Sequence, residues 1–162
     1  IPEMANGALM DLGVYTMNFM TGLFGRPKEI TASAIKLHNG LDGVGTITAS
    51  YETMLVTLFY GKVAPSGNRC EIQGEDGYMT IEGLNAPSRV TITYRDGRVE
   101  ELPLEDIPFR KDLSYEVQAF IDMIQKGDGS EASFNERTRI SLETMDTARA
   151  QMQMHFPNDD LG

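Results

Sequence analysis

Three polar residues recur at helical spacing near the start of the chain: Asp11, Tyr15 and Asn18. Residues three or four apart lie on one side of an α-helix, so a helix would project all three side chains from a single stripe. A carboxylate, a phenol and an amide together can move a proton, orient a hydroxyl group or hold a polar ligand. On spacing alone, the stripe is either a polar wall facing a ligand or the solvent side of an ordinary helix.

The helix that would carry this stripe is predicted from Ala8 to Phe24, because most positions there are apolar and Gly25 and Pro27 are typical of a helix end. At 100° per residue, one side holds Leu9, Leu12, Phe19, Met20 and Leu23, and an adjoining side holds Met10, Val14, Met17 and Phe24. Asp11 is the only charged residue between Glu3 and Arg26. A lone carboxylate on a helix otherwise suited to burial needs partners.

Between Ile30 and Leu102 the pattern changes to period two, which predicts half-buried strands. The clearest apolar sets are Ile47/Ala49/Tyr51, Cys70/Ile72 and Val90/Ile92/Tyr94. Turn residues separate the strands at Asn39-Gly40, Asp42-Gly43, Pro65-Ser66-Gly67, Gly74-Glu75-Asp76-Gly77 and Asp96-Gly97. Sequential hairpins predict an antiparallel sheet, and its threonine-rich outer face is either solvated or packed on another subunit.

Two more helices are predicted after the strands. The first carries Leu113, Val117, Phe120, Ile121 and Ile124 at helical spacing, with Asp112 or Ser114 as its cap and Lys126-Gly127 as its end. The second runs from about Asn135 to Met154, buries Leu142, Met145, Ala148, Met152 and Phe156, and stops before Pro157. Residues 101–112 are predicted to form a connecting loop. This order, without βαβ alternation, indicates an α+β fold.

Composition narrows the classes of function. A length of 162 residues suits one domain over residues 1–162, and 24 acidic against 14 basic residues give a net charge of −10, which disfavours nucleic acid and anionic membranes. No apolar run is long enough to span a bilayer, and a single cysteine suits a reducing compartment, so we expect a cytoplasmic protein. His38 and His155 lack metal-ligand spacing, and we expect no metal site. The start, without methionine and close to a helical pattern, suggests a fragment boundary.

Four stretches in order carry a family resemblance. The run Gly7-Ala8-Leu9-Met10-Asp11-Leu12-Gly13-Val14-Tyr15 resembles the GGALxDxGxY helix that opens the C-terminal domain of the glucose-fructose oxidoreductase and inositol dehydrogenase (Gfo/Idh/MocA) family. The other stretches are residues 67–77, 115–120 and 140–151. With Tyr15 in the motif, the chain is most similar to the tyrosine branch that includes dihydrodiol dehydrogenase.

This resemblance implies an open-faced, mostly antiparallel sheet with helices packed on one face, like the C-terminal domain of dihydrodipicolinate reductase. It implies a single C-terminal substrate and oligomerisation domain that forms a homo-oligomer, such as a dimer, through the open sheet face. The family's N-terminal Rossmann domain is absent from this chain, which contains neither a Glu-Lys-Pro motif nor an intact dinucleotide fingerprint. We therefore expect NAD or NADP to be bound mainly by that domain, and this fragment alone to be inactive.

The implied activity is hydride transfer between NAD or NADP and a small-molecule substrate, namely a sugar, a polyol or a related secondary alcohol. By similarity, Tyr15 is the proton donor or acceptor, and Asp11 orients the substrate hydroxyl or a lysine. A phenol keeps its proton at neutral pH unless a cation lies near, and the family's Glu-Lys-Pro lysine would supply that cation. Asn18 is the candidate substrate contact. The alternatives are a non-catalytic sugar-sensing or dimerisation module and a free-standing sheet assembly module.

Overall fold

The computed structural model describes residues 6–104, 112–127, 129, 131–156 and 159. The chain divides into two compact units, Ile1–Pro65 with Ala132–Gly162, and Ser66–Glu131. The first unit combines helices with a three-stranded sheet, and the second contains a four-stranded sheet. The α+β class predicted from the sequence is confirmed, whereas the extent of a single domain over residues 1–162 stays a prediction.

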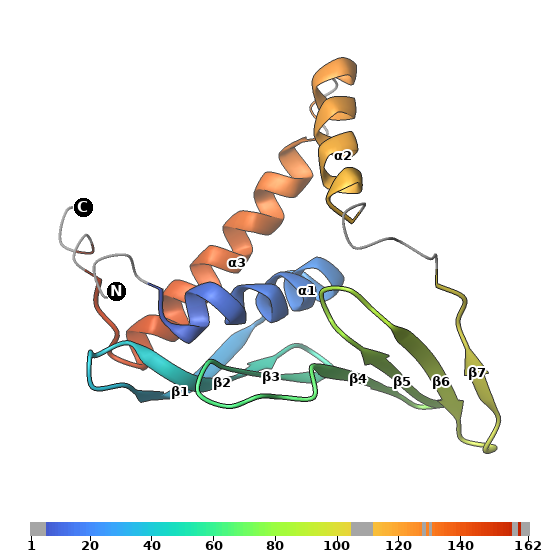
Figure 1. Ribbon diagram of the computed structural model, residues 1–162, viewed down its shortest axis with the longest axis horizontal. Coiled ribbons are helices and arrows are strands. Elements are labelled where there is room, and N and C mark those ends of the chain that lie inside the picture. Colours follow the sequence, from blue (N-terminus) through green and yellow to red (C-terminus); the bar gives the residue numbers. More distant parts are fainter. Residues whose placement is uncertain (1–5, 105–111, 128, 130, 157–158, 160–162) are drawn as a thin grey trace. The chain divides into compact units, whose positions relative to one another are not determined.

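The first unit is a helix layer on one face of an antiparallel sheet (Figure 1). Strands β1 (Glu29–Lys36), β2 (Asp42–Ser50) and β3 (Leu55–Gly61) lie in that order. The helix layer comprises the π-turn η2 (Leu9–Gly13), α1 (Val14–Phe24) and α3 (Glu131–Gln151). Because Ile47 and Ala49 are buried while Thr46 and Thr48 are exposed, the period-two prediction for β2 is confirmed.

The core of this unit lies between the sheet and the helices. Its buried side chains include Leu9, Met17, Met20, Ile30, Ile47, Leu58, Tyr60, Met145, Met152 and Met154. Methionine is flexible and polarisable, so it fills the irregular gaps left between helix and sheet. The opposite sheet face is open, and Thr31, Thr48 and Thr57 form one register row across its three strands.

The predicted α-helix from Ala8 to Phe24 differs from the structure in its first part. The segment η2 has the wider π-helical geometry, and regular α-helical geometry begins with α1. A wider turn shifts the angular position of each residue relative to 100° spacing. Leu12 and Leu23, predicted on the apolar side, are 38% and 53% exposed, so that part of the prediction is wrong. Both leucines border the polar stripe, which therefore has an apolar rim.

Helix α3 starts and ends earlier than the predicted range of about Asn135 to Met154. Met145 and Ala148 are buried as predicted, and Met152 is buried just beyond the helix end. Leu142 is 46% exposed, which contradicts its predicted burial. Its neighbour Ser141 takes the buried position instead, because that serine hydrogen-bonds Thr21 on α1. Phe156 is half-buried, and Pro157 lies outside the described residues.

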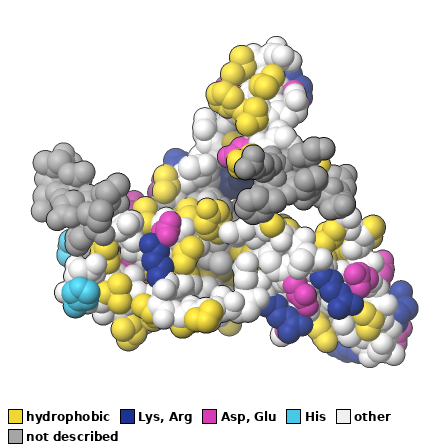
Figure 2. All heavy atoms as spheres, in the orientation of Figure 1, with side chains coloured by type: hydrophobic (Ala, Val, Ile, Leu, Met, Phe, Trp, Pro, Cys, Tyr) yellow, Lys and Arg dark blue, Asp and Glu magenta, His cyan; other side chains and the backbone are white. Residues whose placement is uncertain are grey.

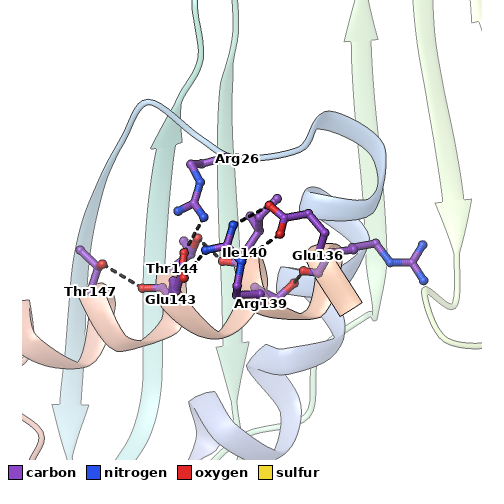
Figure 3. A network of polar contacts seen from close by, with 9 residues as sticks. Arg26, Glu136, Arg139, Ile140, Glu143, Thr144 and Thr147 are labelled. Carbon is purple, nitrogen blue, oxygen red and sulfur yellow. Dashed lines mark hydrogen bonds and ion pairs between the residues drawn. The ribbon is translucent and has the colours of Figure 1, made fainter. Parts of the chain in front are cut away.

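A charged network joins α3 to the α1–β1 connection (Figure 3). Arg26 in that connection pairs with Glu143 on α3, and Arg139 pairs with both Glu143 and Glu136. These side chains are about half exposed, and exposed ion pairs contribute little to stability. The buried side chains of α3 therefore supply most of the stability, and the network adds a surface contact between α3 and the α1–β1 connection.

The second unit contains β4 (Arg69–Gly74), β5 (Gly77–Glu82), β6 (Arg89–Tyr94) and β7 (Val99–Glu101), paired in that order. The predicted turns at 74–77 and 96–97 are present, and Gly97 has φ +87°. The predicted Pro65-Ser66-Gly67 turn does not join two paired strands, because β3 and β4 belong to different sheets. β3 ends at Gly61 and β4 begins at Arg69, so this segment connects two separate sheets.

Helix α2 (Asp112–Lys126) confirms the first of the two later helices, and Gly127 with φ +55° ends it. Its apolar positions are exposed, as the hydrophobic side chains over this helix in Figure 2 show. The exposed members are Leu113, Tyr115, Val117, Phe120, Ile121 and Ile124. Among the described residues, no helix combines the length and apolar character needed to cross a membrane.

Candidate active site

The entry to the first helix is held by a buried carboxylate. Asp42 is only 1% exposed, and its Oδ2 accepts a hydrogen bond from the backbone N–H of Leu9 at 2.7 Å. A Cβ on Gly7 would lie 1.9 Å from Asp42 Oδ1, so any larger residue there would have to displace the carboxylate. A negative group at the start of a helix is stabilised by the unpaired amides and the helix dipole. Asp42 thus fixes where the helix begins.

This role differs from the predicted one, in which Asp42-Gly43 formed a turn. The turn is made earlier, where Leu37 N–H donates to Leu41 O and Gly40 has φ +83°. A β-bulge between Ile35 and Lys36 shifts the register so that Lys36 pairs with Asp42. Asp42 therefore starts β2 and points into the unit, and the Asp-Gly pair gave a misleading turn signal.

The predicted polar stripe lies on the open side of the helix. Asp11 belongs to η2, whereas Tyr15 and Asn18 belong to α1, and all three are exposed. The Tyr15 residue is 52% exposed and the Asp11 side chain 56%. With Leu12 beside them, these groups form a surface that is polar along one line and apolar at its edge. Such a surface can hold an organic molecule with hydroxyl groups.

Asp11 has a partner that the sequence did not predict. Lys62, directly after β3, places its Nζ 2.8 Å from Asp11 Oδ2 and also donates to the Asn6 carbonyl at 2.8 Å. Its backbone N–H donates to Gly43 O at 2.8 Å, which ties it to the start of β2. No motif surrounds Lys62, and its contact with Asp11 depends on the folded sheet, so local patterns gave no signal.

Asn18 is tied to α3. Ser141 Oγ donates to Asn18 Oδ1 at 2.9 Å and also lies 2.6 Å from Thr21 Oγ1. Ser141 and Thr21 are both buried, so this pair of hydroxyl groups restricts the orientation of the Asn18 side-chain amide. With its oxygen engaged, the Asn18 side chain has its NH₂ group as its hydrogen-bond donor.

Other ionisable groups are less suited to proton transfer. Burial raises the pKa of Tyr60, and the charge of Asp42 adds to this effect, so the phenol stays protonated and donates to Met152 Sδ. Burial, followed by the charge of Glu71, raises the pKa of the half-buried Cys70 thiol. His38 and His155 are exposed, and the described residues contain no cluster of side chains that could hold a metal ion.

Residues 1–80 match the family model described as the GFO/IDH/MocA C-terminal domain. The chain belongs to the Gfo/Idh/MocA family. Membership fits the position of the polar stripe on the first helix of the matched segment. It also accounts for the open antiparallel sheet with helices on its other face.

Curated relatives extend the similarity over almost the whole chain. The scyllo-inositol 2-dehydrogenase (NADP(+)) IolU of Bacillus subtilis (strain 168) is 38% identical over 159 residues, covering 98% of this chain and 48% of the relative. The trans-1,2-dihydrobenzene-1,2-diol dehydrogenase of Oryctolagus cuniculus is 24% identical over 164 residues, covering 96% of this chain and 50% of the relative. The chain therefore spans about half the length of the curated relatives it matches.

Solved structures share the fold. A complex of a variant of KijD10, a 3-ketoreductase from Actinomadura kijaniata, with TDP-benzene and NADP superposes with a TM-score of 0.76 and 20% identity. The match covers 94% of this chain and 49% of that chain. UDP-N-acetylglucosamine 3-dehydrogenase GnnA from Acidithiobacillus ferrooxidans gives a TM-score of 0.74 and 18% identity, covering 93% of this chain and 48% of that chain. These similarities support the family fold.

Proposed function

We propose that this chain is the substrate-facing half of an NAD(P)-dependent oxidoreductase that acts on a sugar, a polyol or a related secondary alcohol. The observation that carries the proposal is the open stripe on the first helix, where an ion-paired Asp11 and an exposed Tyr15 lie beside exposed apolar Leu12. The curated relatives bear the names of dehydrogenases, which favours catalysis over a sugar-sensing or dimerisation module.

In the oxidation direction, Tyr15, as a phenolate beside the lysine cation of the nucleotide-binding domain, accepts the proton of the substrate hydroxyl. The carbinol carbon loses its hydride in the same step and becomes a carbonyl carbon. In the reverse direction, Tyr15 returns the proton to the carbonyl oxygen. Asp11 orients the substrate by accepting a hydrogen bond from a second hydroxyl, or it holds the catalytic lysine of the nucleotide-binding domain. Asn18 donates from its NH₂ group to a neighbouring substrate oxygen. Such positioned proton transfer accounts for roughly 10²- to 10⁴-fold of a rate enhancement.

The cofactor fits this arrangement only in part. The open stripe and its apolar rim offer a surface against which a planar ring could lie, and when bound a nicotinamide accepts or supplies the hydride. The chain has no intact dinucleotide fingerprint, so we assign most of the binding to a Rossmann domain N-terminal to it. The name of the Bacillus subtilis relative specifies NADP(+), which favours NADP here.

The proposal includes a homo-oligomer formed through the open sheet face. The register rows on this face join Thr31, Thr48 and Thr57, and Ser33, Thr46 and Phe59. Phe59 is 59% exposed, and a lightly charged face with an exposed aromatic suits protein contact. A cytoplasmic location completes the proposal and rests on the single cysteine.

The proposal is tested with Tyr15→Phe in the polypeptide that carries this chain together with its nucleotide-binding domain. Removing one hydroxyl from an exposed tyrosine should leave the melting temperature nearly unchanged and lower kcat by roughly 10²-fold or more. Tyr78→Phe, at a tyrosine 43% exposed on β5, is the matched control and should retain turnover. Wild-type turnover of Tyr15→Phe on every active sugar or polyol substrate would remove Tyr15 from the mechanism.

A further inference from the structure

The ion pair between Lys62 and Asp11 takes no direct part in the proton and hydride transfers of the proposed reaction. We propose that Lys62 is a positioning residue that aims the Asp11 carboxylate at a hydroxyl of the substrate next to the reacting one. This inference rests on the proposed function, because it concerns the orientation of a group in the same site. Its basis is the geometry around the first turn of the helix.

Lys62 binds two acceptors that lie on the same side of the helix entry. Its Nζ is 2.8 Å from Asp11 Oδ2 and 2.8 Å from the carbonyl oxygen of Asn6. The side chain is only 29% exposed, about half the exposure of the Asp11 side chain. A cation held between a fixed backbone carbonyl and a carboxylate restricts the rotation of that carboxylate, and charge-assisted hydrogen bonds of this length are among the stronger ones.

A backbone hydrogen bond to β2 fixes the position of Lys62. The backbone N–H of Lys62 donates to Gly43 O at 2.8 Å. Asp42, which precedes Gly43 in β2, accepts a hydrogen bond from Leu9 N–H at 2.7 Å. The start of β2 and the end of β3 therefore both contact the first turn of the helix, β2 through the Asp42 carboxylate and β3 through the Lys62 ammonium group. The buried Asp42 fixes the backbone of η2, and the partly exposed Lys62 fixes a side chain that projects from it.

In this arrangement the two carboxylate oxygens of Asp11 have different roles. Oδ2 is taken by Lys62, whereas Oδ1 accepts no hydrogen bond from any residue that the structure describes. An oriented carboxylate with one free oxygen can accept a hydrogen bond from a substrate hydroxyl in a single geometry. The adjacent cation also keeps the pair neutral overall, which reduces the desolvation cost when a neutral alcohol covers it.

The test uses Lys62→Met and Lys62→Arg in the two-domain enzyme. Lys62→Met should lower kcat by about tenfold to a hundredfold, since misplacing a catalytic group by about 1 Å has effects of this size. Lys62→Arg should recover most of the loss, because a guanidinium can bridge the same two acceptors. Lys28→Met is the matched control, because Lys28 also forms an ion pair, at 3.1 Å with Glu52, in the same unit. It should leave kcat unchanged.

A double-variant comparison separates positioning from general stabilisation. If Lys62 acts through Asp11, then Lys62→Met combined with Asp11→Asn should lose no more kcat than Asp11→Asn alone. Multiplied losses, or wild-type kcat in Lys62→Met, would overturn the inference. Should Lys62→Met fail to fold by circular dichroism, Lys62→Gln replaces it and is judged by the same two outcomes.

The same series distinguishes this inference from the proposed function. If Tyr15→Phe is inactive while Lys62→Met behaves as wild type, the role of Lys62 is wrong and the function stands. If Tyr15→Phe keeps full turnover, the proposed acid–base role fails whatever Lys62 does.

Discussion

The two compact units use the same antiparallel pairing but bury very different amounts of side chain. Every member of the main core cluster belongs to the first unit, whose sheet is covered by helices on one face. In the described part of the second unit, only Thr80, Ile81 and Val90 are buried. Catalytic groups need supports whose own positions are fixed by packing. The candidate site is built on the unit that can provide this rigidity.

The largest difference between the units should appear when a buried isoleucine is truncated. Ile47→Ala in β2 removes a side chain with 0% exposure and should lower the free energy of unfolding by about 2–5 kcal/mol. The half-buried Ile72 in β4 is the counterpart, and Ile72→Ala should cost less, because part of its surface already contacts water. Urea denaturation measures both. Equal losses would show that the second unit is as tightly packed as the first.

A smaller effect is expected at the helix entry. Gly7→Ala places a Cβ 1.9 Å from Asp42 Oδ1 and must displace the carboxylate from Leu9 N–H. We expect a loss of about 1–3 kcal/mol in the free energy of unfolding, typical of overpacking, together with reduced turnover in the two-domain enzyme. Gly67→Ala, with nothing within 4 Å of its Cβ, should change neither quantity. A tolerated Gly7→Ala would argue against Asp42 as the anchor.

The smallest effect should come from the exposed charges. Hydrogen bonds from Arg26 and then Arg139 lower the pKa of Glu143. A lowered folded-state pKa stabilises the fold above the unfolded-state pKa, and this contribution is lost as the pH falls through the folded value. Glu143→Gln should therefore melt slightly below wild type at neutral pH and equal to it in the acid range, roughly below pH 4. Glu101→Gln in the second unit, paired with one arginine, is the counterpart and should change less.

The sequence predicted the elements better than their contacts. Period-two alternation and Gly40, Gly97 and Gly127 gave the strands and several ends correctly, because side-chain direction and φ are local properties. The sequence allowed two interpretations of the stripe of Asp11, Tyr15 and Asn18: a wall facing a ligand, or the solvent side of a helix. The three side chains are exposed on one side of the helix, as their helical spacing predicts. The catalytic roles of these residues stay predictions.

What the sequence could not predict depends on partners far along the chain. The burial of Asp42 requires Gly7 and Leu9 to lie against the start of β2, and the position of Lys62 requires β3 to end beside η2. The exposure of Leu142 follows from Ser141 packing on α1. Each contact joins segments that no local pattern relates. The antiparallel pairing is confirmed, whereas the division of the strands into two sheets was not predicted, because the turn residues do not show which strands pair.

The methionine-rich core beneath the stripe has a consequence for oxidative damage. Five methionines are buried there: Met17, Met20, Met145, Met152 and Met154. The sulfur of Met152 accepts a hydrogen bond from the Tyr60 hydroxyl. Oxidation would turn these flexible apolar side chains into polar sulfoxides that the core cannot solvate. Peroxide that enters during transient opening should therefore inactivate the protein by loosening the layer under the helix, while Tyr15 itself remains chemically intact.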